Sequence, residues 1–398
     1  MSGMPLEKSP MSAPAGRIAK LADQCVQCGL CLPVCPTYAL DRNEAESPRG
    51  RIAIAAALAR GAVDATSALR EHLDHCLGCL SCENVCPAHV QYDELLIGTR
   101  ALLGPSPRRP RLLLALIERP ALLRVLRRLG DRVVPPRWKA WLTGHLRATS
   151  AWRAALSGMP AAAPTVPLAA GSDERPQLAL FPGCVASVED AEAQHASLRL
   201  LRAAGFRVSV LPAFCCGAMD LHGGATAAAE RAAQRLRRHW QASGAGRLVS
   251  VTPGCLGTLR HALPGVSVVD PLELLASHGE SLRFRPLPLR VAVHVPCTQV
   301  NVAGTDGDML RLLRRIPGLE VLPLSRPPHC CGAAGSHQLE FPERAAQLRE
   351  ATLHQLGALD PQRLLSSNIG CRLHLGAATG TLPSQHPLTL LAQQLELD

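Results

Sequence analysis

Aromatic residues and long apolar runs are scarce in this sequence. Phe, Trp and Tyr make up 3% of its 398 residues, so a hydrophobic core must be built mainly from aliphatic side chains. No apolar run approaches the roughly 18 residues of a membrane-spanning helix, and the first twenty residues lack the apolar stretch of a secretory signal. We therefore expect a cytoplasmic protein. Because 47% of the residues are apolar and only 19% are charged, general disorder is excluded.

Signatures of a catalytic centre are missing as well. The sequence contains neither the glycine-rich fingerprint of a dinucleotide site nor a phosphate-binding loop, and it shows no acid–base pattern suited to substrate chemistry. We therefore predict no catalytic residue in this chain. The sequence is instead rich in cysteine, with 16 residues. In a reducing compartment, clustered cysteines favour metal or redox chemistry over disulfides.

The positive charge is confined to one stretch. The chain has 42 Lys and Arg against 32 Asp and Glu, but 12 of these basic residues lie between Pro105 and Arg153, where Glu118 and Asp131 are the only acids. This stretch separates two groups of eight cysteines, and a Pro/Ala-rich segment over 158–176 follows it. We infer an N-terminal module over 1–104, a connector over 105–176 and a C-terminal module after it.

The first eight cysteines form two copies of one run. Four cysteines at x2, x2 and x3 spacing, with a proline after the last, begin at Cys25 and recur 51 residues later at Cys76. Bacterial ferredoxins use this spacing, and their fourth cysteine binds the neighbouring cluster. Zinc sites use Cys-x2-Cys pairs rather than such triplets. We therefore expect two [4Fe–4S] clusters, the first on Cys25, Cys28, Cys31 and Cys86 and the second on Cys76, Cys79, Cys82 and Cys35.

Helical patterns over 51–60 and 67–75 lie between the two runs. The N-terminal module thus resembles the α-helical ferredoxin domain of fumarate-reductase-type iron–sulfur subunits.

The C-terminal module contains an internal repeat. Each copy begins with a short apolar run that ends at a cysteine. An amphipathic helix and a second apolar run follow and end at Cys-Cys-Gly. A long helix and a third apolar run then end at Gly-Cys. Such alternation predicts a parallel α/β sheet with the cysteines just past the carboxyl ends of its strands. We expect two lobes, lobe 1 over 177–285 and lobe 2 over 286–398, related by a pseudo-twofold axis. The candidate metal ligands are Cys184, Cys215, Cys216 and Cys255 in lobe 1 and Cys297, Cys330, Cys331 and Cys371 in lobe 2.

Glycines follow or precede these cysteines. Side chains of successive residues normally diverge, so two adjacent cysteines can address one metal centre only in a turn, which Gly217 and Gly332 permit. Gly254 and Gly370 indicate close backbone approach before the last cysteine of each lobe. One or two further iron–sulfur clusters, or zinc, would suit such sites, and inert buried cysteines are the remaining alternative. Four nearby histidines are candidates for a ligand, for a proton relay or for ordinary polar contacts: His222, His294, His337 and His374.

These motifs resemble the CCG cysteine-rich repeats found in heterodisulfide reductase, anaerobic glycerol-3-phosphate dehydrogenase, lactate-utilisation and glycolate oxidase subunits. The segments that carry the resemblance include CVQCGLCLPVCPTYAL, SPRGRI, FCCGAMDLH, HVPCTQ, HCCGAAGSH and SNIGCRLHL. Joined behind a double ferredoxin run, they are most similar to the family of glycolate oxidase iron–sulfur subunits, over nearly the whole chain. The implied fold is a helical ferredoxin-like domain followed by two tandem α/β lobes with parallel sheets.

The resemblance also implies a function. A flavin-containing dehydrogenase subunit would oxidise a 2-hydroxy acid, most simply glycolate to glyoxylate, and this chain would pass the electrons singly toward quinone. Lactate-utilisation and anaerobic glycerol-3-phosphate dehydrogenase complexes, or a thiol–disulfide reductase, are the alternatives. Repeats of the heterodisulfide-reductase type end in a Cys-x2-Cys motif. In this sequence Thr258 and His374 stand where the second cysteine of that motif would be. This departure favours electron transfer over disulfide cleavage.

The basic stretch predicts two short amphipathic helices, punctuated by Pro110 and Pro120. Its apolar positions recur at helical spacing, with Arg124, Arg127 and Arg128 on the other side: Leu112, Leu113, Leu116, Ile117, Leu122, Leu126 and Leu129. Three tryptophans also lie here: Trp138, Trp141 and Trp152. Residues 105–153 therefore suit peripheral docking on the anionic inner face of the cytoplasmic membrane, or packing on the protein or a partner subunit. We see no nucleic-acid recognition motif and expect no nucleic-acid partner.

Overall fold

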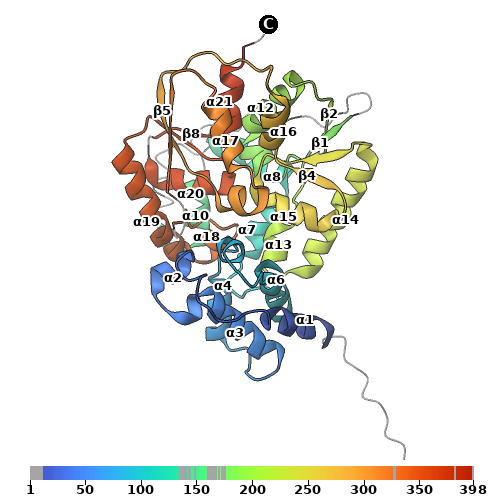
Figure 1. Cartoon of the computed structure of the whole chain (residues 1–398), viewed down its shortest axis with the longest axis vertical. Coiled ribbons are helices and arrows are strands. Elements are labelled where there is room, and N and C mark those ends of the chain that lie inside the picture. The colour runs from blue at the N-terminus through green and yellow to red at the C-terminus, as the bar shows by residue number, and fades with distance from the viewer. Residues whose placement is uncertain are drawn as a thin grey trace, which may run out of the picture.

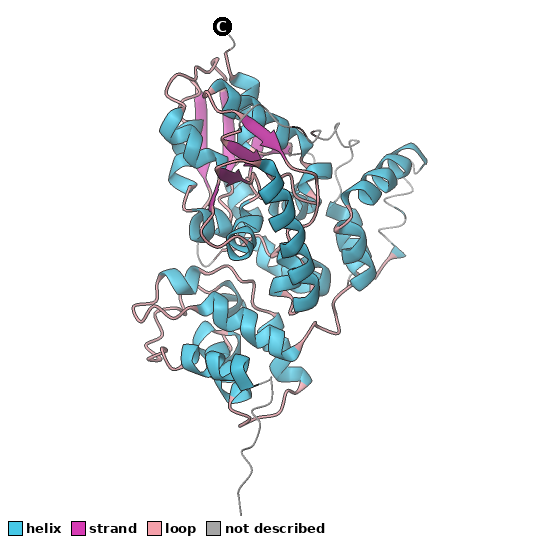
Figure 2. Ribbon diagram, turned by 90° about the vertical axis from the view of Figure 1, so that its right-hand side faces the viewer, coloured by secondary structure: helices cyan, strands magenta, loops and turns pink. Residues whose placement is uncertain are grey.

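The structure is a computed structural model that describes residues 12–396 except 134–140, 142–144, 148, 159–167, 169–170, 172–175, 326–328 and 381. A helical N-terminal domain lies below two α/β lobes (Figure 1). All strands lie in the upper body, and the lower body is built from helices and loops (Figure 2).

The N-terminal domain consists of short helices joined by the cysteine loops. They are α1 (Ser12–Ala22), α2 (Pro36–Asp41), the 3-10 helix η1 (Glu44–Glu46), α3 (Pro48–Ala59), α4 (Ser67–Asp74), α5 (Ser81–Asn84) and α6 (Tyr92–Leu103). The prolines that follow Cys35 and Ser47 begin α2 and α3, because proline is favoured in the first turn of a helix. Ile18, Ile52, Ala55 and Leu95 form the core where α1, α3 and α6 meet. The helical patterns expected over 51–60 and 67–75 are confirmed as α3 and α4.

Each lobe contains one four-stranded parallel sheet. The strands of lobe 1 are β1 (Leu178–Leu180), β2 (Val208–Val210), β3 (Arg247–Val249) and β4 (Ser267–Val269), in the order β2-β1-β3-β4. Those of lobe 2 are β5 (Leu289–Val293), β6 (Leu319–Pro323), β7 (Arg363–Leu365) and β8 (Ser384–Gln385), in the order β6-β5-β7-β8. The two orders are the same, which confirms a repeated parallel α/β unit. The fourth strand of each lobe was not anticipated from the sequence.

Helices cover both sheets. Lobe 1 has α11 (Ala186–Glu189), α12 (Ala191–Ala203), α13 (Ala218–His222), α14 (Thr226–Ser243), α15 (Pro253–Ala262) and α16 (Pro271–His278). Lobe 2 has the π-helix η2 (Gln299–Ala303), α17 (Asp306–Leu313), α18 (His337–Glu340), α19 (Pro342–Leu359), α20 (Ile369–Thr379) and α21 (Pro387–Gln394).

The lobes pack on each other through equivalent helices. Helix α12 of lobe 1 contacts α21 of lobe 2, and α16 of lobe 1 contacts α17 of lobe 2. Helix α12 of lobe 1 corresponds to α17 of lobe 2, and α16 of lobe 1 corresponds to α21 of lobe 2. The two contacts are therefore equivalent when the lobes are exchanged, as a pseudo-twofold relation requires. Leu180 and Leu200 share one hydrophobic cluster with Val293 and Leu391, so a single core runs through both lobes.

The connector contributes α7 (Arg111–Ile117), α8 (Pro120–Val133) and α10 (Ala151–Gly158). In α8 the side that carries Arg127 faces the protein, because the buried Arg127 Nε lies 2.8 Å from the Glu189 carboxylate of α11, whereas Arg128 is exposed. The apolar side faces solvent, with Leu122, Val125, Leu126 and Leu129 all exposed. Trp138 lies outside the described residues. Among the helices that the structure describes, none is both long and apolar enough to cross a bilayer.

Candidate metal centres

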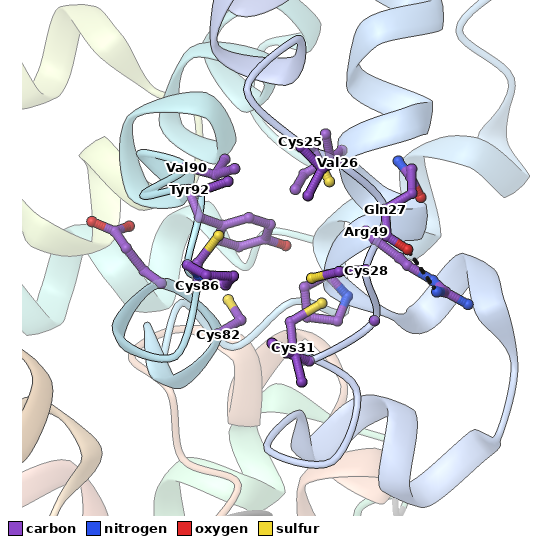
Figure 3. A pocket seen from close by; sticks show the side chains of 17 residues that line it. Cys25, Val26, Gln27, Cys28, Cys31, Arg49, Cys82, Cys86, Val90 and Tyr92 are labelled. Atoms are coloured by element: carbon purple, nitrogen blue, oxygen red, sulfur yellow. Dashed lines mark hydrogen bonds between the residues drawn. The ribbon is translucent and has the colours of Figure 1, made fainter.

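The first cavity of the N-terminal domain gathers cysteines from both ferredoxin runs. Its lining includes Cys25, Cys28 and Cys31 from the loop between α1 and α2, together with Cys86 after α5. Figure 3 shows these sulfur atoms facing a common space beside the ring of Tyr92. Gly29, at a φ of +84°, lets the loop turn back between Cys28 and Cys31.

The second cavity gathers the other four ferredoxin cysteines. It is lined by Cys76, Cys79 and Cys82 from the second run and by Cys35 from the first. Cys82 and Tyr92 line both cavities. The fourth cysteine of each run therefore reaches the cavity of the other run, in the grouping that the spacing predicts.

The two cavities differ in exposure. Cys28 is exposed, and Val26 and Leu30 on the same loop are 69% and 58% exposed. Cys35 and Cys82, by contrast, are buried. The cysteines of the first cavity are therefore the more exposed of the two sets, and exposed apolar side chains stand beside them.

A buried cation lies beside the second cavity. Arg51 is 1% exposed and lines this cavity. Burial by itself would lower the pKa of its guanidinium. The opposite effect of the neighbouring groups is larger and raises this pKa; these groups are Cys76, Tyr92, Cys35 and Glu46. Sequence reasoning missed this residue, although it stands within the SPRGRI segment. A fixed positive charge here would offset the negative charge of a thiolate-bound cluster.

Glu46 ties Arg51 to lobe 2. Its carboxylate pairs with Arg51 and accepts hydrogen bonds at 2.7 Å from His72 Nδ1 and 2.8 Å from His75 Nδ1. Arg344 of α19 reaches the same carboxylate at 3.1 Å. Burial raises the pKa of Glu46, but the hydrogen bonds from His75 and His72 and the charge of Arg51 outweigh it and lower the pKa to about 2.

A second contact joins the loop of Cys79 to lobe 2. Asn301, in the π-helix η2, donates from Nδ2 to the carbonyl of Cys79 at 2.6 Å and to Ser81 Oγ at 3.1 Å. Burial and the neighbouring Cys330 raise the pKa of the Cys79 thiol to about 12. The second ferredoxin cavity thus lies next to the cysteines of lobe 2.

The four cysteines of lobe 1 converge past the carboxyl ends of β1, β2 and β3. The neighbouring thiols of Cys184 and Cys216 lower the pKa of Cys215 well below its usual value. The Cys216 and Cys255 sulfurs are 3.3 Å apart. The expected convergence of these four thiols is therefore present in the structure.

Lobe 2 repeats this arrangement. The neighbouring thiols of Cys297 and Cys331 lower the pKa of Cys330, and Cys330 and Cys371 in turn raise the pKa of Cys331. In both lobes the glycine after the cysteine pair has a positive φ, +84° at Gly217 and +80° at Gly332. Its N–H donates back to the sulfur two residues earlier, at 3.3 Å in lobe 1 and 3.4 Å in lobe 2. A Cβ at Gly332 would lie 2.3 Å from the carbonyl oxygen of Ala345, so glycine is required there.

Cys255 and Cys371 lie in the first turns of α15 and α20. The partial positive charge of a helix N-terminus favours a thiolate at this position. Gly254 is approached closely, as expected, because a Cβ there would lie 2.9 Å from Asn368 Nδ2 of lobe 2.

The four candidate histidines have different surroundings. His222 and His337 lie near the N-terminal domain: His222 Nδ1 is 3.9 Å from Asp93 Oδ1, and the His337 ring packs on Phe341, which itself contacts the ring of His75. His374 Nε2 lies 3.1 Å from the carbonyl oxygen of Ala345. His294 alone of the four lies with cysteine sulfurs: one of its ring nitrogens and the sulfurs of Cys331 and Cys371 are all within 4.8 Å of one another. Burial lowers the pKa of His294 to about 4, which keeps the imidazole neutral.

The donor chemistry fits iron and sulfide. Each N-terminal cavity brings together at least the four thiols that a [4Fe–4S] cluster needs. Each lobe offers four more, which would suit a further cluster or zinc.

Comparisons with known proteins agree with these motifs. Residues 21–90 match the family described as 4Fe-4S dicluster domain, and residues 178–260 and 291–376 each match the family described as cysteine-rich domain. The chain is 30% identical to the glycolate oxidase iron–sulfur subunit of Escherichia coli (strain K12), over 94% of each protein. It is 27% identical to the probable glycolate oxidase iron–sulfur subunit of Bacillus subtilis (strain 168), over 88% of this chain and 87% of that protein. A hypothetical protein from Helicobacter pylori has a crystal structure of similar fold, with a TM-score of 0.50 and 12% identity over 99% of this chain and 74% of that one.

Proposed function

Because this chain belongs to the family of glycolate oxidase iron–sulfur subunits, we propose that it transfers electrons in a complex that oxidises glycolate to glyoxylate. The observation that supports this most directly is the convergence of four thiols at each of two adjacent cavities. A flavin-containing partner subunit would perform the substrate chemistry, and the electrons would leave toward quinone.

Two [4Fe–4S] clusters would be held by crossed ligand sets. The first set is Cys25, Cys28, Cys31 and Cys86, and the second is Cys76, Cys79, Cys82 and Cys35. When bound, such clusters accept and release single electrons with little rearrangement. Arg51 would raise the reduction potential at the second site, because its positive charge favours the more negative reduced state.

The rim of the first cavity is a suitable docking surface for the flavin subunit. Val26, Leu30 and Val85 are exposed apolar residues close to the first set of ligands. Apolar side chains that stand together on a surface mark interaction sites. Asn301 and Arg344 hold the opposite side of the domain against lobe 2, which leaves the first cavity as the side that a partner can reach.

The thiols of the two lobes would bind further metal centres. Lobe 1 would use Cys184, Cys215, Cys216 and Cys255, and lobe 2 would use Cys297, Cys330, Cys331 and Cys371. The N–H groups of Gly217 and Gly332 and the N-termini of α15 and α20 would stabilise the thiolates.

Helix α8 would dock the complex peripherally on an anionic membrane, on its inner face. Its exposed apolar residues recur at i, i+3, i+4 and i+7, as on an interfacial helix. Exposed Arg119 and Arg128 flank this stripe and would attract anionic headgroups. The pairing of Arg127 with Glu189 holds the helix with this face outward.

We expect replacement of Leu122, Val125, Leu126 and Leu129 by serine to weaken binding to anionic lipid vesicles by on the order of a hundredfold or more, because four side chains lose apolar burial. The fold should persist, since all four are exposed. Cosedimentation with vesicles at low and high salt measures the effect, with Val63→Ser, at an exposed apolar residue of the N-terminal domain, as control. If the fourfold variant pellets as the wild type does, α8 is not the membrane contact.

Anaerobic co-purification with native partners tests the function itself. We expect iron, sulfide and a flavin subunit in the preparation, and reduction of an artificial dye by glycolate in preference to D-lactate or glycerol-3-phosphate. A preference for either of the other two would assign the chain to a different dehydrogenase complex. Zinc in place of iron and sulfide would exclude electron transfer.

A further inference from the structure

The two lobes differ at the residue that follows their first strand. Phe181 follows β1 and His294 follows β5, and each lies three residues before the first cysteine of its lobe. The backbone N–H groups make equivalent bonds, from Phe181 to the Val249 carbonyl at 2.8 Å and from His294 to the Leu365 carbonyl at 2.9 Å. The two side chains therefore occupy matching positions under the pseudo-twofold relation.

In lobe 1 this position is hydrocarbon. The ring of Phe181 is 1% exposed and packs edge-on against Phe214, with the ring centroids 5.1 Å apart. It offers no donor atom, so the four thiols are the ligands that lobe 1 brings together.

In lobe 2 the same position presents an imidazole to the thiols. A His294 ring nitrogen lies within 4.8 Å of the sulfurs of Cys331 and Cys371, and all three residues are buried. Ligand atoms this close can bind the same metal ion or neighbouring ions of one cluster. Nδ1 is already paired with Ser366 Oγ at 3.0 Å, which leaves Nε2 for a metal. Metal-bound histidines characteristically make such a bond with their second nitrogen.

We propose that His294 is a ligand of the metal centre in lobe 2, and that this centre is an iron–sulfur cluster bound by thiolates and one imidazole. Lobe 1, by contrast, uses thiolates alone. This inference deepens the proposed function and rests on it. Iron is favoured over zinc because Cys79 of the second ferredoxin cavity adjoins Cys297 and Cys330, a position suited to a redox centre.

His374 is the alternative, because it stands where related repeats carry their last cysteine. What separates the two histidines is their position relative to the thiols. The group of ligand atoms within 4.8 Å of one another comprises His294, Cys331 and Cys371, whereas His374 Nε2 pairs with the Ala345 carbonyl at 3.1 Å. It is buried as His294 is and lies in the same lobe, so it provides a matched control.

The expected consequence is a difference between the lobes. An imidazole is neutral where a thiolate is negative, so a mixed centre carries less negative charge and has a higher reduction potential than an all-thiolate one. His294→Cys should keep the cluster and lower its midpoint potential.

Isotope labelling tests the ligand directly. The anaerobically purified chain is prepared with ¹⁵N only in histidine, reduced, and examined by pulsed EPR. We expect a strong ¹⁵N coupling of a directly bound imidazole in the wild type and in His374→Ala, and its loss in His294→Cys and His294→Ala. Iron and sulfide per chain should be retained in His294→Cys and reduced in His294→Ala.

Three results would overturn the proposal: no strong ¹⁵N coupling in the wild type, a coupling that survives in His294→Cys, or zinc in lobe 2 instead of additional iron and sulfide. The wild-type measurement needs no variant and so does not depend on how substitutions fold. It also needs neither substrate nor partner, so its failure is distinguishable from a failure of dye reduction by glycolate.

Discussion

Replacement of Cys35 by serine should remove the cluster on Cys76, Cys79 and Cys82 and leave the cluster nearest to Cys35 in sequence intact. Cys35 lines the second cavity with those three cysteines, and a cluster that loses one of four thiolates is no longer fully ligated. We expect about four irons and four sulfides fewer per chain. Cys86→Ser should remove a similar amount from the first cavity.

Double substitutions identify which cluster is lost. Adding Cys76→Ser to Cys35→Ser should cost no further iron, because both residues line the same cavity. Adding Cys28→Ser should cost about four more irons, because Cys28 lines the other cavity. The opposite pattern would mean that each run binds its own cluster and that the crossed assignment is wrong. Iron and sulfide analysis, together with EPR of the reduced protein, gives the answer.

Glu46→Gln should lower the free energy of unfolding by about 3–5 kcal/mol, because it leaves the buried Arg51 without its counter-charge. The same change removes an anchor of Arg344 and so loosens the docking of the N-terminal domain on lobe 2. Since the folded-state pKa of Glu46 is lowered to about 2, its stabilisation is complete above the ordinary carboxyl pKa of about 4.5. It is lost only as the pH falls from there toward 2. Anaerobic urea unfolding near neutral pH, followed by circular dichroism, measures the full effect.

Glu94→Gln is the matched control. It breaks the Arg17–Glu94 pair, whose side chains are 65% and 43% exposed, and such surface pairs contribute less than about 1 kcal/mol. If both variants unfold at the same urea concentration, the Glu46 network does not stabilise the domain.

The spacing of residues in the sequence was sufficient to predict those features that depend on residues close together in the chain. Three cysteines at intervals of three residues fit on one loop, so the two runs alone predict which cysteines gather at each ferredoxin cavity, except that Cys82 lines both. The apolar runs that precede Cys184 and Cys297 are likewise confirmed as strands β1 and β5, because each is a short aliphatic segment followed by glycine or proline.

Sequence spacing was insufficient to predict those features that depend on contacts between distant segments of the chain. The leucine and arginine sides of α8 were predictable, but not which side faces the protein, because that depends on Glu189 more than sixty residues away. The strand β8 has only two residues and carries no periodic pattern. His294 was one of four candidate histidines, and its closeness to the sulfurs of Cys331 and Cys371, which come from other segments of the lobe, distinguishes it from the others.

The helix pairs α12–α21 and α16–α17 also bear on how this chain arose. They form the self-complementary interface that two copies of a single-repeat protein would make as a homodimer. A gene duplication that fused two such subunits would keep that interface and free each half to change on its own. In such a history Phe181 and His294 would descend from one position, which is hydrocarbon in one half and imidazole in the other.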